Sequence, residues 1–112
     1  TSSPTGRDIE TAGFPMKMAE LLAVLPGVGY VTRQSALDVP GIRRTKKAIR
    51  LAFQTQLAGL GFSMVEIIST CNTNWHMGPM EAIEWAQEHM VAYFPLGDTK
   101  VSDGVKALRG GK

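Results

Sequence analysis

The chain has 112 residues, a formal net charge of +2 and 44% hydrophobic residues, which fits one small globular domain and excludes two separate cores of ordinary size. Its 12 Lys and Arg residues against 10 Asp and Glu give no bulk charge that would favour nucleic acid or an anionic membrane. The single cysteine, and a start without an apolar signal-peptide core, favour a cytoplasmic, reducing compartment. No apolar run approaches the roughly 20 residues that cross a bilayer.

The first part of the chain predicts a loop, a helix and a short strand. Residues 1–13 mix Ser, Thr, Pro, Gly and charged residues without periodicity and contain no initiator Met, so we expect a fragment of a longer protein. From Phe14 the apolar residues recur at three- and four-residue steps, which predicts a helix that ends before Pro26. Residues 28–32 are β-branched and aromatic and predict a strand, in which Gly29 indicates a close backbone approach.

The middle of the chain predicts a βαβ unit. Residues 42–57 carry an apolar stripe on one side and basic residues elsewhere, which is typical of a long amphipathic helix. Residues 62–68 then read as a strand buried on both faces, as in a parallel sheet, with Glu66 as an exception that needs explaining. A right-handed crossover would make strands 28–32 and 62–68 parallel neighbours.

Residues 69–77 follow that strand as a polar loop at its carboxyl end, where open α/β sheets place ligands. Gly78-Pro79 begins another helix, which closes at residues 94–97. Residues 98–112 predict a loose tail or a partner-docking arm.

Most charged residues that could bind a ligand are explained more simply as solvent-exposed surface. The basic run of residues 43–47 could follow phosphates, but charges opposite an apolar stripe are usually a solvated helix face, and no aromatic residues are interleaved to stack bases. We therefore expect no nucleic-acid partner. Glu81, Glu84 and Glu88 are expected to be surface charges. We find no nucleophile elbow, Walker loop or dinucleotide fingerprint in the sequence.

Cys71 differs because of its position in the polar loop. A lone Cys is usually a small inert hydrophobe, yet this thiolate could bind a soft metal or a cluster together with ligands from elsewhere. Asn72, Thr73 and Asn74 can supply hydrogen bonds there. His76 could be a second ligand, although capping the next helix is the simpler role.

Several stretches resemble one known family. They are residues 21–31 (Leu-Leu-Ala-Val-Leu-Pro-Gly-Val-Gly-Tyr-Val), residues 42–49, and above all residues 69–75 (Ser-Thr-Cys-Asn-Thr-Asn-Trp) with Pro79-Met80-Glu81-Ala82. They resemble the thiamine-diphosphate-binding β subunit of 2-oxoacid:ferredoxin oxidoreductases, in the 2-ketoisovalerate and 2-oxoglutarate branches. The resemblance covers nearly all of residues 1–97, and implies an α/β fold, the parallel-sheet βαβ half of a thiamine-diphosphate-binding domain. Residues 98–112 would be its tail.

The resemblance also implies cofactors. In family members with a set of four cysteines, the Cys of the loop serves as the fourth ligand of a [4Fe–4S] cluster. The resemblance therefore implies this metal-binding role for Cys71 and a position near the cluster and the thiamine site for Thr73 and Asn74. The family's other cysteines, its Gly-Asp-Gly motif for diphosphate and Mg²⁺, and its Thr-Gly-Gly-Gln loop are not in this sequence. Thiamine diphosphate and Mg²⁺ would therefore be held mostly by a preceding part of the subunit.

The implied function is oxidative decarboxylation of a 2-oxoacid to its acyl-CoA, with electrons passing through the cluster to ferredoxin. The implied partners are the remainder of the β subunit, an α (pyrimidine-binding) subunit, ferredoxin, CoA and the 2-oxoacid, in an oligomer. The sequence departs from the family's usual loop at Asn72 and His76, where Pro and Gly are usual. A free-standing α/β interaction module with an idle Cys71 remains the alternative, and the chain alone is expected to be inactive.

Overall fold

The computed structural model describes Glu10, residues 14–70 and residues 78–110. Its elements follow the chain in the order α2 (Met18–Ala23), β1 (Val28–Ser35), α3 (Val39–Leu57), β2 (Phe62–Ile68), α5 (Pro79–Trp85), the π-helical turn η1 (Ala86–Met90), α6 (Val91–Tyr93), β3 (Gly97–Val101) and α7 (Asp103–Gly110). The α/β class predicted from the sequence is confirmed. The first helix is shorter than predicted, because Phe14 and Met16 are exposed and Ala19 is the buried residue of α2.

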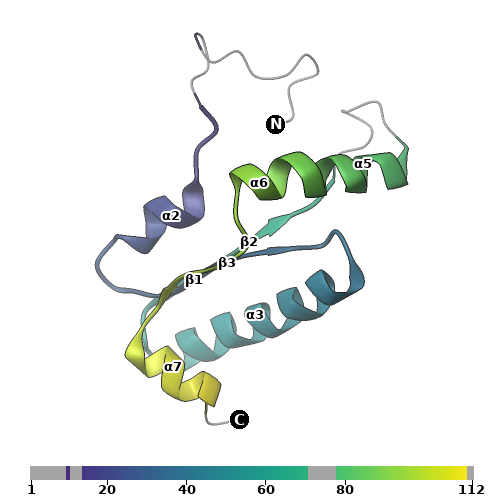
Figure 1. Cartoon of the computed structure of the whole chain (residues 1–112). Helices are drawn as coiled ribbons and strands as arrows, with labels where there is room; N and C mark the ends of the chain where they lie inside the picture. Colours follow the sequence, from purple (N-terminus) through teal and green to yellow (C-terminus); the bar gives the residue numbers. More distant parts are fainter. Residues whose placement is uncertain (1–9, 11–13, 71–77, 111–112) are drawn as a thin grey trace.

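The sheet has three strands in the order β2-β1-β3. β1 and β2 are parallel, with Arg33 opposite Glu66 and Ser35 opposite Ile68 in the register. Helix α3 connects these two strands (Figure 1). The predicted βαβ unit is therefore confirmed, with a longer first strand and with a helix that begins three residues earlier than its sequence stripe.

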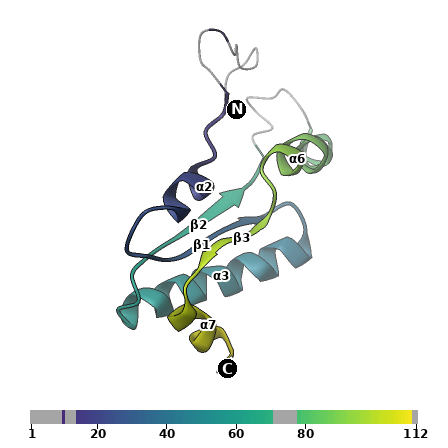
Figure 2. The same cartoon turned by 60° about the vertical axis from the view of Figure 1, so that its left-hand side comes forward.

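Helices cover both faces of the sheet (Figures 1 and 2). Successive residues of β1 point to opposite faces. Tyr30 packs with Leu51 of α3 and Val105 of α7, whereas Val31 packs with Ala19 of α2. All eight residues of β1 are buried, so this strand is the centre of the fold.

The ends of α3 follow from local sequence. Asp38 is the N-cap, and its Oδ1 accepts a hydrogen bond of 2.7 Å from the backbone N–H of Gly41. Beyond the other end, Gly61 has a φ of +119°, and a Cβ there would lie 2.4 Å from the carbonyl oxygen of Gly27. Glycine at this position lets the chain turn tightly from the helix into β2.

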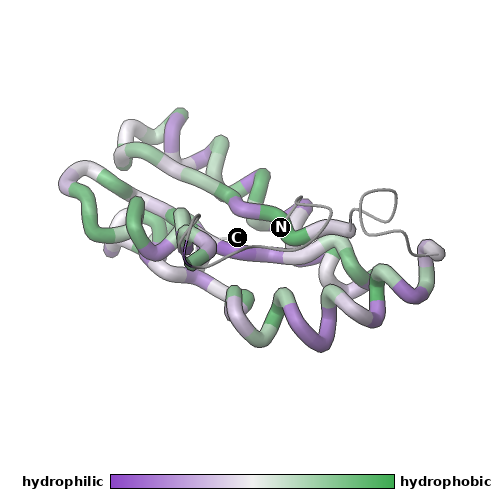
Figure 3. Tube along the Cα trace, turned by 90° about the horizontal axis from the view of Figure 1, so that it is seen from above, coloured by the Kyte–Doolittle hydropathy of each residue, from purple (hydrophilic) through white to green (hydrophobic). Residues whose placement is uncertain are grey.

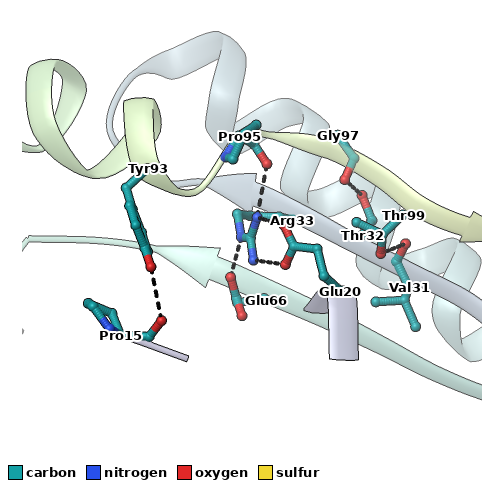
Figure 4. Close-up of polar contacts among 10 residues, drawn as sticks. All are labelled: Pro15, Glu20, Val31, Thr32, Arg33, Glu66, Tyr93, Pro95, Gly97 and Thr99. Atoms are coloured by element: carbon teal, nitrogen blue, oxygen red, sulfur yellow. Dashed lines mark hydrogen bonds and ion pairs between the residues drawn. The ribbon is translucent and has the colours of Figure 1, made fainter. Parts of the chain in front are cut away.

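Residues 98–112 were expected to form a tail, but this segment includes most of β3 and all of α7. β3 pairs antiparallel to β1. The register skips Thr99, which gives a β-bulge, and two side chains bridge the strands there: Thr99 Oγ1 donates to the carbonyl of Val31 and Thr32 Oγ1 to that of Gly97, both at 3.1 Å (Figure 4). Apolar Val101, Val105 and Leu108 anchor the segment on the Tyr30 side of the sheet.

β2 differs from its prediction. Its apolar run indicated burial on both faces, but β2 lies at one edge of the three-stranded sheet. Phe62 is 48% exposed and Ile67 is 43% exposed. The sequence pattern of an interior strand is thus found in an edge strand, within the part of the chain that the structure describes.

No helix among the described residues is long and apolar enough to cross a membrane.

Along the helices, stretches of hydrophobic residues are interrupted by hydrophilic ones in the trace coloured by hydropathy (Figure 3).

The close approach predicted at Gly29 is confirmed and gives a test of the packing between β1 and the end of α3. A Cβ at Gly29 would lie 2.7 Å from the carbonyl oxygen of Leu60 and 3.0 Å from Thr55 Cγ2. We expect Gly29→Ala to lower the free energy of unfolding by about 1–3 kcal/mol, measured by denaturant titration. Gly78→Ala is the control, because its added methyl meets no atom of the described residues within 4 Å; equal effects of the two variants would contradict this packing.

Candidate functional site

The carboxyl ends of β1 and β2 form the candidate site. A cavity of about 470 Å³ lies at the end of β2, beside the helical segment of residues 79–93. Its lining residues lie before α2 (Pro15 and Met16), in β2 (Glu66, Ile67 and Ile68) and directly after it (Ser69), in η1 (Met90) and directly after α6 (Phe94). The chain leaves this cavity through Ser69 and Thr70 toward Cys71.

Arg33 is the centre of a group of polar contacts that includes Glu66 of the cavity wall (Figure 4). Its side chain is fully buried and donates from Nε to Glu66 Oε2 on the neighbouring strand. Its two terminal nitrogens donate to the carboxylate of Glu20 on α2, at 2.8 and 2.6 Å, and Nη1 also donates to the carbonyl of Pro95 at 3.1 Å. One guanidinium thus joins α2, β1, β2 and the segment that leads into β3.

The ring of Phe94 covers the guanidinium, with 5.1 Å between Arg33 Cζ and the ring centroid. The hydrogen bonds with Glu20 hold the pKa of Arg33 above its ordinary value, even though burial opposes this, and those with Glu66 act in the same direction. The same pairing lowers the pKa of the Glu20 carboxyl below 4.5. Arg33 and Glu20 are therefore both charged at neutral pH.

The ion pair with Arg33 limits what the carboxylate of Glu66 can do in the cavity. Glu66 lines the cavity, but one oxygen of its carboxylate accepts from Arg33, so the group is positioned as part of an ion pair. The other walls are mostly apolar. The cavity is shaped to bury a nonpolar surface beside the exit of β2.

The described residues do not provide a metal site by themselves. Within residues 14–70 and 78–110 and at Glu10, no group of three or more His, Cys, Asp or Glu side chains could hold a metal ion.

The predicted site residues Cys71, Thr73 and Asn74 lie outside the described residues, as does His76. Glu81, Glu84 and Glu88 are exposed, as expected for surface charges. Sequence reasoning missed Arg33 and Glu20, and left Glu66 unexplained. Glu66 was the signal that could have found its partner, because an acidic residue in an apolar strand needs a group of opposite charge, and Arg33 directly follows the neighbouring predicted strand.

Comparisons with known proteins find relatives of this chain among curated proteins. The chain is 39% identical over 93 residues to ketoisovalerate oxidoreductase subunit VorA of Methanothermobacter thermautotrophicus, an alignment that covers 83% of this chain and 20% of that protein. It is 37% identical over 93 residues to the subunit of the same name from Methanothermobacter marburgensis, again covering 83% of this chain and 20% of the relative. The chain thus spans about a fifth of the length of these curated relatives. No protein-family model and no solved structure matches the chain.

The pairing of Arg33 with Glu20 predicts a specific acid sensitivity. Because the pKa of Glu20 is lowered, the stability from this pair is fully present above the ordinary pKa of 4.5 and is lost as the pH falls through the lower folded-state pKa. We expect the wild-type protein to lose more free energy of unfolding between about pH 5 and about pH 3 than Glu20→Gln does. Glu84→Gln, at an exposed glutamate, should keep the wild-type profile; a wild-type profile for Glu20→Gln would contradict the assignment.

Proposed function

We propose that this chain forms an α/β part of a subunit of a 2-oxoacid oxidoreductase that acts on ketoisovalerate. The observation that carries the proposal is the similarity of 39% and 37% over 83% of the chain to two proteins named as subunits of that enzyme. The proposed reaction is oxidative decarboxylation to the acyl-CoA. CoA, ferredoxin and a pyrimidine-binding α subunit are the proposed partners.

The open edge of β2 supports a place within a larger assembly. Ile49, Phe53 and Leu57 recur every fourth residue along α3 and are 38%, 67% and 87% exposed. Phe53 also lines a depression of about 260 Å³ with Ser63 of β2, so this stripe adjoins the free edge. Proteins usually cover such an edge and such an apolar surface, and we assign that role to the remainder of the β subunit or to a partner subunit.

Cys71 is the proposed iron ligand of this chain. It follows Ile68, the last residue of β2, by three positions in the sequence, and the cavity described above adjoins the start of its loop. Thr73 and Asn74 are proposed to hydrogen-bond around the cluster, where such contacts tune its potential. The other cluster ligands and the residues that hold thiamine diphosphate and Mg²⁺ are assigned to other parts of the enzyme.

The cofactors supply the electron sink and the one-electron carrier of the proposed reaction. The contribution of this chain is positioning. Arg33 binds Glu66 two residues before the end of β2 and binds Glu20 on α2. The exit of β2, and with it the start of the Cys71 loop, is therefore fixed against two other elements.

Because the cofactor-binding residues are assigned to other parts of the enzyme, we predict that the 112-residue chain alone does not turn over 2-oxoisovalerate with CoA and an artificial electron acceptor. Its residues do not include the family's diphosphate and Mg²⁺ motif, and the chemistry depends on the cofactor. The assay should be run beside the complete enzyme, which should be active. Turnover by the isolated chain would overturn this assignment, and a complete gene product without oxidoreductase activity would favour the interaction module.

The role of Cys71 is tested in the complete enzyme by Cys71→Ala. Because one of four thiolate ligands is lost, we expect lower iron content and a weaker visible absorption band of the cluster. The fold should change little, since deleting one sulfur removes little apolar area at about 25 cal/mol per Å². Ser69→Ala, two residues away, should keep its iron; unchanged iron in Cys71→Ala would return Cys71 to the role of an inert side chain.

A further inference from the structure

A second, larger cavity lies on the opposite face of the sheet, between α3 and α7. It has a volume of about 560 Å³, within the range of about 300–1,000 Å³ that is typical of small-molecule sites. β1 contributes Gln34 and β3 contributes Asp98, and the remaining lining residues come from the two helices: Arg44, Lys47, Arg50, Leu51, Gln54, Leu108 and Arg109. None of these residues has a part in the oxidoreductase proposal.

The charges around this cavity are almost all positive. Its lining includes four cationic side chains, Arg44, Lys47, Arg50 and Arg109, and a single carboxylate, Asp98. Asp98 is already paired with Arg109, at 3.0 Å. Arg44, Lys47 and Arg50 form no ion pair with another described residue. Three uncompensated cations thus converge on one concave surface, which favours an anion.

The position of these cations follows from helical spacing. Arg44, Lys47, Leu51 and Gln54 are separated by three or four residues and share one face of α3. Arg43 and Lys46 belong to the same basic run but do not line the cavity. The run that the sequence indicated to be a solvated face is therefore divided, with Arg44 and Lys47 directed to the cavity.

The inner wall of the cavity is ordered and partly apolar. Leu51 is buried, and Leu108 packs against the cluster of Tyr30 and Val105. Gln34 is buried and its Nε2 donates to Thr32 Oγ1 at 2.8 Å. Arg109 lies over the ring of Tyr30, with Cζ 5.6 Å from the centroid. The wall thus offers an apolar surface and a fixed amide behind a cationic rim.

We propose that this cavity binds a nucleotide-type organic phosphate, with its phosphate groups on Arg44, Lys47 and Arg50 and its ring against Leu51, Leu108 and Gln34. Arginine and lysine form charge-assisted hydrogen bonds with phosphate oxygens. An inorganic anion would use the rim but not the apolar wall. A ring without phosphate would use the wall but leave the cations unpaired.

The experiment measures binding of ADP, pyrophosphate and adenosine by calorimetry to the complete gene product, with any subunits that co-purify. We expect one ADP per cavity, and pyrophosphate and adenosine each to bind at least about tenfold more weakly than ADP. ADP that binds no tighter than pyrophosphate would overturn the proposal, as would the absence of ADP binding.

Two double variants separate the cavity from diffuse surface charge. Arg44→Gln with Lys47→Gln should weaken ADP binding by about tenfold or more, because two of the rim cations are lost. Arg43→Gln with Lys46→Gln makes the same change of charge on the same helix outside the cavity, and should change the dissociation constant by less than about twofold. All four side chains are exposed, so folding should be retained in both variants. Equal weakening by the two double variants would overturn the proposed site.

Discussion

The buried guanidinium of Arg33 is the interaction on which the arrangement of this fold depends. A fully buried charge is costly unless it is paired and hydrogen-bonded, and Arg33 meets this requirement with partners from three other parts of the chain. The helix α2 has six residues and one buried side chain, Ala19, so its apolar contact with the sheet is small. The pairing of Glu20 with Arg33 gives this short helix a defined position that the apolar contact alone does not specify.

The sequence predicts the βαβ unit well because its signals are local. The 3.6-residue stripe of α3 and the β-branched residues of the two strands all lie within their own elements. β3 was missed because its residues, Gly-Asp-Thr-Lys-Val, have little strand preference. That strand depends on pairing with β1, which is more than 60 positions away, as the contact of Thr32 with Gly97 shows.

In the candidate site, too, features within one segment could be predicted from the sequence, whereas contacts between distant segments could not. The Cys71 loop was predicted to be a site from its residue types and its place after a strand, and its residues 71–77 lie outside the described residues. The two ion pairs of Arg33 could not be predicted from one segment, because Arg33 is 13 residues from Glu20 and 33 residues from Glu66. Adjacent residues of β1 serve two different surroundings: Arg33 pairs with Glu66 of the candidate site, and Gln34 lines the cationic cavity.

The β-bulge at Thr99 makes β3 a poorer edge than β2 for pairing with an additional strand. β3 is five residues long, its register with β1 is interrupted, and Asp98 and Lys100 are exposed along it. Short, bulged and charged strands are poor templates for another strand. β2 has seven residues, and its register with β1 is continuous from Tyr30 onward. An additional strand would therefore pair with β2, on the side where Phe53 of α3 lies beside Ser63 of β2. β3 forms the opposite edge of the sheet.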